Sequence, residues 1–64
     1  MYSVIALNKI GKELDNSECF TDEETAKHHF EMIKYEMLYE KSKCINLELI
    51  YNDESILDSF QKIW

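Results

Sequence analysis

Two adjacent histidines, His28 and His29, are the side chains in this sequence that most directly suggest chemistry. On an α-helix, Glu24, His28 and Glu31 would follow one another along one face. Carboxylate oxygens and imidazole nitrogens are common ligands of zinc and other transition metals. No second segment supplies the rest of a coordination sphere, so the sequence predicts no metal site and no cofactor.

The two cysteines, Cys19 and Cys44, would act as nucleophiles only with a base beside them. No flanking signature marks either thiol, and strand cysteines are usually inert packing groups. The sequence contains no glycine-rich nucleotide-binding pattern. A chain of 64 residues also has little room for the pocket of roughly 300 Å³ or more that a small-molecule site occupies. We therefore expect a protein that is not an enzyme.

A third group consists of carboxylates around the expected second strand and the start of the central helix: Asp15, Glu18, Asp22, Glu23 and Glu24. Such a cluster is usually a solvated face that keeps a small protein soluble. Spaced carboxylates can also imitate phosphates and occupy the basic groove of a nucleic-acid-binding protein. An acidic nucleic-acid mimic that inhibits a DNA- or RNA-binding protein is therefore the alternative function.

The charge balance excludes several classes of partner. Thirteen acidic residues against seven basic ones give a formal net charge of −6, and every basic residue is Lys. Recognition of nucleic acids relies on Arg for bidentate contacts and on a basic stripe for the phosphate backbone. We expect binding neither to nucleic acid nor to a membrane surface.

The length predicts a single domain spanning residues 1–64, near the lower limit for folding without a disulfide or a metal. Dimerisation would bury apolar surface that one copy cannot bury alone, which favours a homo-oligomer. Two cysteines make no disulfide framework, and the sequence contains no signal peptide or membrane span. The predicted location is the cytoplasm, with two reduced and half-buried thiols.

The element that must position these residues is a long helix, predicted from Thr21 to about Lys41 with no Gly or Pro inside it. Thr21 and Glu24 have the spacing of a capping box. The acidic residues that follow Thr21 suit the positive end of the helix dipole, and Lys41 and Lys43 suit the negative end.

Two apolar stripes run along this predicted helix. One is expected to lie on a sheet: Ala26, Phe30, Ile33 and Met37. The other is roughly opposite: His28, Met32, Tyr35 and Tyr39, with Leu38 on its flank. A helix on one sheet buries only one side, so the second stripe is either an ordinary wet surface or a contact surface. Tyr and Met are enriched at interfaces, which favours the contact surface.

Alternating apolar residues predict strands at residues 1–8 and 44–51, and Gly11 marks the turn of a first hairpin. Residues 13–20 would return as an edge strand. After the turn signal at residues 52–53, residues 55–64 fit either a helix or a strand. The short connection favours the strand. We therefore expect an α+β fold with one helix on an antiparallel sheet, in the order ββαββ, or ββαβα if the last segment is helical.

The leading functional prediction is a small acidic, non-enzymatic protein-interaction module, a homodimer that binds or inhibits another protein. The contact would be formed by the aromatic and Met face of the helix, extended by the last residue: Tyr35, Tyr39, Met32, His28, Leu38 and Trp64. Aromatic anchors offer large contact area at low side-chain entropy cost. The length, the acidity and the lack of Arg suit an accessory protein of a phage or mobile element.

Overall fold

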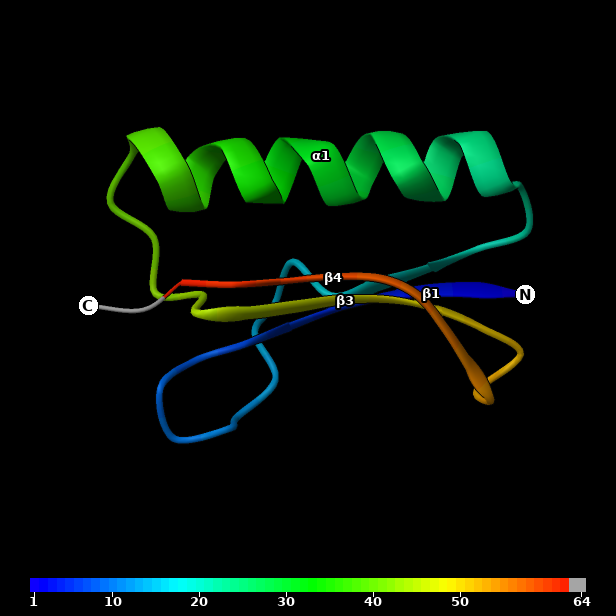
Figure 1. Ribbon diagram of the computed structural model, residues 1–64, viewed down its shortest axis with the longest axis horizontal. Coiled ribbons are helices and arrows are strands. Elements are labelled where there is room, and N and C mark those ends of the chain that lie inside the picture. The colour runs from blue at the N-terminus through cyan, green and yellow to red at the C-terminus, as the bar shows by residue number, and fades with distance from the viewer. Residues whose placement is uncertain (63–64) are drawn as a thin grey trace.

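Four antiparallel strands in the order β2-β1-β3-β4 form the sheet of the computed structural model, which describes residues 1–62 (Figure 1). The elements in chain order are β1 (Tyr2–Leu7), β2 (Glu18–Phe20), α1 (Glu23–Tyr39), β3 (Asn46–Tyr51) and β4 (Ser55–Gln61). The helix packs on one face of the sheet, so the predicted α+β fold and its ββαββ order are confirmed. Residues Ser55–Gln61 form the strand that we favoured for the last segment, whose residues 63–64 lie outside the described range.

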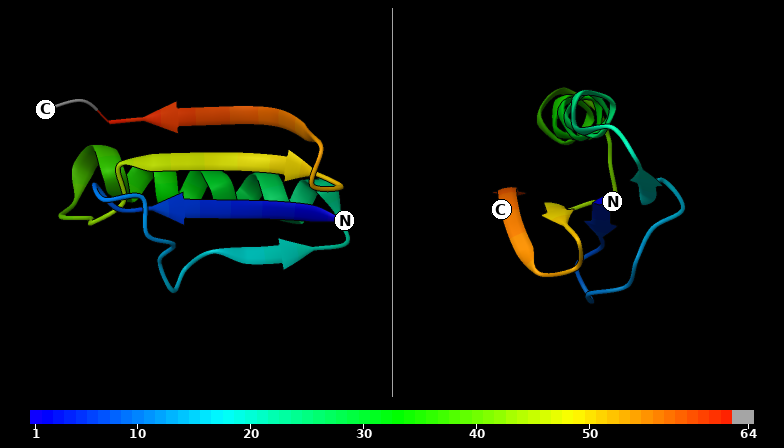
Figure 2. Two further views of the ribbon diagram at one scale, coloured as in Figure 1. Left: turned by 90° about the horizontal axis from the view of Figure 1, so that it is seen from below. Right: turned by 90° about the vertical axis from the view of Figure 1, so that its right-hand side faces the viewer.

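The core lies between one stripe of α1 and the two central strands. The helix stripe is the predicted one: Ala26, Phe30, Ile33 and Met37. Beneath it lie two register pairs of β1 and β3: Val4 with Leu49, and Ala6 with Leu47. Figure 2 shows the helix behind these strands, with β2 and β4 at the two edges. Burial of each large side chain contributes about 1.5–3 kcal/mol, so this layer supplies most of the hydrophobic stabilisation.

The helix is shorter than predicted at both ends. Its N-cap is Asp22, whose Oδ2 accepts hydrogen bonds from the backbone N–H and the hydroxyl of Thr25, both at 2.9 Å. The predicted cap at Thr21 was therefore wrong, because the next residue offers a better acceptor. The helix ends at Tyr39, and its last turn carries no basic residue, so Lys41 and Lys43 lie in the connection that follows.

The predicted strand over residues 13–20 was wrong in its first part. After a turn in which Gly11 has a φ of 82°, one bridge joins Leu7 and Glu13, and regular pairing resumes only where Glu18 faces Val4. Between these points Ser17 Oγ accepts a hydrogen bond from the Ala6 N–H at 2.8 Å. A side chain thus takes the place of a backbone partner. The part of the β1–β2 connection that directly follows β1 extends on the side of the sheet away from the helix, and the later part rises toward the helix (Figure 1).

Strand β4 is the longer of the two edges and is almost wholly exposed. It carries apolar side chains at Ile56 and Leu57, and its pairing with β3 shifts register between Leu49 and Ile50. In the middle of the strand, Asp58 Oδ1 accepts a hydrogen bond from the backbone N–H of Ser59 at 2.8 Å. The Asp58 carboxylate thus engages the Ser59 N–H, which an added strand would need as a hydrogen-bond donor. The charge of Asp58 also opposes strand pairing at this edge.

We predict that the Asp22 cap makes stability depend on pH. Its hydrogen bonds from the backbone and then the hydroxyl of Thr25 hold the pKa of Asp22 below its ordinary value of 3.8. The cap therefore stabilises the fold above that pH, and this stabilisation is lost as the pH falls through the folded pKa. Asp22→Ala should lower the thermal midpoint at neutral pH and have little effect at pH about 2. An equal loss at both pH values would contradict this role.

Asp58→Val is expected to expose the β4 edge to strand pairing, because it frees the Ser59 N–H and removes a charge. Asp58→Asn is the matched control, since its amide oxygen can still accept the hydrogen bond. Light scattering of concentrated samples should rise above the wild-type level for Asp58→Val and much less for Asp58→Asn. Equal scattering from wild type and Asp58→Val would show that Asp58 does not protect the edge.

Candidate interaction surface

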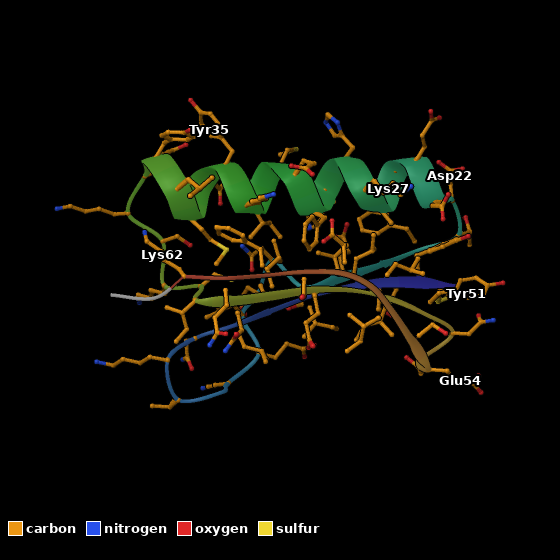
Figure 3. All side chains as sticks on the ribbon, in the orientation of Figure 1. Asp22, Lys27, Tyr35, Tyr51, Glu54 and Lys62 are labelled. Atoms are coloured by element: carbon orange, nitrogen blue, oxygen red, sulfur yellow. The ribbon has the colours of Figure 1, made fainter. Side chains whose placement is uncertain are left out.

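The outer face of α1, defined here as His28, Met32, Tyr35, Leu38 and Tyr39, points away from the sheet. Its four large apolar or aromatic members are 47% to 71% exposed, with Tyr39 the most exposed and Leu38 the least. Figure 3 shows Tyr35 directed into solvent above the helix. The structure therefore brings together five of the six predicted contact residues, and Trp64 lies outside the described residues.

Tyr35 and Tyr39 form an aromatic pair on this face. Their ring centroids are 4.8 Å apart with an interplanar angle of 47°, as expected for tyrosines one helical turn apart. Each ring restricts the other, so less conformational freedom is lost when a partner covers them. The pair is thus a partly ordered aromatic surface, available for contact without rearrangement of the fold.

Lysines beside the outer face are engaged with their own chain. Lys34 Nζ lies 5.1 Å from the centroid of the Phe60 ring on β4, a cation–π contact between the helix and the sheet edge. Lys27 Nζ is 3.7 Å from a carboxylate oxygen of Glu23 one turn earlier. This pair is exposed and contributes little to stability. Neither lysine lies on the outer face, although the exposed carboxylate of Glu31 follows His28 along that face.

The five residues of the predicted acidic face are all exposed: Asp15, Glu18, Asp22, Glu23 and Glu24. One of them also has a structural role, because the carboxylate of Asp22 caps the helix. A shallow surface depression at the helix start is lined by Asp22, Glu24, Thr25 and His28. Asp22, Glu23 and Glu24 thus form a solvated surface at the start of α1, whereas Asp15 lies in the β1–β2 connection and Glu18 in β2.

The second histidine holds the β1–β2 connection against the helix. His29 Nε2 lies 2.8 Å from the backbone oxygen of Asn16, and its ring is 5.1 Å from that of Phe20. His29 thus contacts two segments that precede the helix. Within residues 1–62, no three His, Cys, Asp or Glu side chains are grouped so that they could hold a metal ion.

The thiols differ from the prediction that both are half-buried. Cys19 is exposed, with its Sγ 3.4 Å from Ser3 Oγ, whereas Cys44 is fully buried, and both are free. The Cys44 thiol donates a hydrogen bond to the backbone oxygen of Asn46 at 3.2 Å. Burial raises the pKa of Cys44, which keeps its sulfur protonated and unreactive.

Sequence reasoning missed a group of lysines at the end of the molecule where α1 finishes. Lys9 and Lys43 line one surface depression together with Asn8, Ser42 and Ile45. These lysines come from connections more than thirty residues apart, between β1 and β2 and between α1 and β3. Each lysine lies in the connection that follows an element, β1 or α1, and it is the topology that brings the ends of these two elements to the same side of the sheet.

No helix within residues 1–62 is long and apolar enough to cross a bilayer. Comparison with known proteins found no matching family model and no significant match to a curated protein or a solved structure.

The two cysteines should react with a thiol reagent at very different rates. In the folded protein at mildly alkaline pH, one thiol per chain should react rapidly, and Cys19→Ser should remove that phase. Cys44 should react only when the chain opens, because burial and its raised pKa both suppress the thiolate. Reagent absorbance follows both phases, with denaturant as the control that exposes both thiols. Rapid labelling of Cys44 in the folded state would contradict its burial.

Proposed function

We propose that this chain is a small, non-enzymatic protein-interaction module that acts as a homodimer and binds or inhibits another protein through the outer face of α1. The observation that supports this most strongly is the exposed ring pair of Tyr35 and Tyr39, flanked by Met32 and Leu38 on the side of the helix that the sheet cannot reach. Aromatic residues and Met are enriched at the centres of interfaces.

The energetic argument rests on preorganisation. The helix is held on the sheet by its own buried stripe, so binding at the outer face requires no folding of the contact element. Two free cysteines, with no disulfide in the described chain, are consistent with a reducing compartment such as the cytoplasm. We include this location in the proposal.

The second candidate function is the acidic nucleic-acid mimic, which the exposure of all five carboxylates supports. Mimicry requires carboxylates that are available to a basic groove, and the cap at Asp22 engages one of them. Charge reversal at Glu23 and Glu24 should abolish binding by a mimic and barely change an aromatic contact. Binding by a mimic should also weaken steeply as salt rises.

The aromatic face is tested by Tyr35→Ala with Tyr39→Ala. A tagged wild-type chain is first used to capture the partner protein from an extract of the cells that produce this chain. The affinity of the chain for that partner is then measured. The double variant should bind at least about ten-fold more weakly, because central aromatic residues dominate interface energies. Ile56→Ala with Leu57→Ala is the matched control, since it removes two exposed apolar side chains from the sheet edge. Unchanged partner binding by the tyrosine variant would refute the proposal.

A further inference from the structure

Charged residues are separated between the two ends of α1. The helix start carries Asp22, Glu23 and Glu24, and the β3–β4 turn adds Asp53 and Glu54 at the same end. Figure 3 shows Asp22 and Glu54 at one end of the molecule and Lys62 at the other. The longest dimension of the molecule is 31 Å, so the two groups are well beyond a Debye length of about 8 Å.

The opposite end carries most of the lysines of the chain. Five of the seven lie there: Lys9, Lys12, Lys41, Lys43 and Lys62. Glu13, Glu36 and Glu40 also lie at this end, so within residues 1–62 the lysines there exceed the carboxylates by two. An otherwise acidic protein thus has one locally basic end. Its opposite end is acidic, with two cations: Lys27, whose Nζ is 3.7 Å from Glu23, and the amino group of Met1, which donates a hydrogen bond to Asn52.

The outer face of α1 lies between these two ends. From His28 to Tyr39 it spans about 17 Å at 1.5 Å per residue. If two copies packed these faces together with parallel helices, each charged end would lie beside the same end of the other copy. With antiparallel helices, each acidic end would lie beside a basic end, and a two-fold axis would form this contact twice. The helix dipoles favour the same arrangement.

We propose that, in the absence of another bound protein, the outer face of α1 is covered by a second copy of this chain in antiparallel orientation. This inference rests on the proposed function, and it makes self-association compete with partner binding. The two-fold axis passes between Met32 and Tyr35, so Met32 of one copy meets Tyr35 of the other. His28 then meets Tyr39 of the other copy. The acidic first turn of each helix then lies at the end of its partner that carries Lys41 and Lys43.

The strength expected of this dimer follows from its size. Five side chains on one helix face form a small contact compared with the roughly 20–30 residues per side of a standard interface. The dimer is therefore expected to dissociate in the micromolar range and to weaken as salt rises, because its end contacts are exposed. Sedimentation of the full chain from micromolar to millimolar concentration measures this dissociation constant.

Charge reversal tests the orientation. Lys41 and Lys43 lie outside the helix. The double substitution Lys41→Glu with Lys43→Glu should raise the dissociation constant of the dimer by about ten-fold. Adding Glu23→Lys and Glu24→Lys exchanges the two ends at unchanged net charge and should restore the wild-type dissociation constant. Circular dichroism checks that the variant with all four substitutions remains helical. A dissociation constant that these charge reversals leave unchanged would overturn the antiparallel arrangement.

Disulfide trapping provides a second measurement that does not depend on the charge variants. In a Cys19→Ser background, chains with His28→Cys and chains with Tyr39→Cys are mixed and oxidised mildly. Antiparallel packing predicts mixed dimers, which intact mass distinguishes from dimers of either variant alone. Ile56→Cys is the control and should not cross-link. Same-variant dimers in excess would overturn the proposal.

The failure of this inference can be distinguished from failure of the proposed function. A chain that stays monomeric at all concentrations, yet loses a foreign partner through Tyr35→Ala with Tyr39→Ala, would overturn the second copy as the occupant. The outer face would then remain a docking surface for another protein. If Tyr35→Ala with Tyr39→Ala changes neither partner binding nor self-association, both the proposed function and the second-copy inference are refuted.

Discussion

The packing of one helix stripe on two central strands is the interaction on which the rest of this structure depends. Phe30 and Met37 contribute the largest buried side chains of the helix, and Leu47 and Leu49 contribute those of β3. Within residues 1–62, one helix and one sheet form only one such layer. The opposite face of the helix and the far face of the sheet are therefore left without a covering element, whatever residues they carry.

This constraint separates residues that stabilise the fold from residues that are available for binding. His28 and His29 are adjacent, yet one lies on the exposed outer face and the other contacts the backbone of Asn16. The same division applies to the thiols, since Cys44 belongs to the core and Cys19 to the surface. The exposed ring pair of Tyr35 and Tyr39 belongs to the second class, because its removal leaves the buried stripe intact.

Residue spacing predicted the layer but not the details at its boundaries. The helical period of the Ala26 to Met37 stripe and the alternation around Leu47 and Leu49 are determined by burial, so both were readable from the sequence. The cap at Asp22 depends on which of two neighbouring acceptors reaches the first turn, which spacing alone does not decide. The same helical period predicted which residues form the exposed face. It contains no information about which partner that face binds.

Side chains that replace backbone partners were the other source of error. Ser17 accepts a hydrogen bond from the Ala6 N–H, so the β1–β2 pairing is interrupted within residues 13–20, whose apolar alternation is poor. The basic end was missed for a related reason: its lysines lie in separate connections, and only the fold brings them near one another. Contacts between distant segments depend on topology, which local pattern does not contain.

The β3–β4 turn has a consequence for engineering. Asn52 and Asp53 adopt φ values of 53° and 58°, a left-handed conformation that glycine tolerates with less strain. Asn52 has a second task, because its backbone N–H and its side chain both bond Met1 and thereby tether the first strand. Glycine at Asn52 would relax the turn but remove the side-chain hydrogen bond of that tether, whereas Asp53 makes no such contact with Met1. Glycine at Asp53 should therefore stabilise the turn without loss of a contact to Met1, whereas glycine at Asn52 should not.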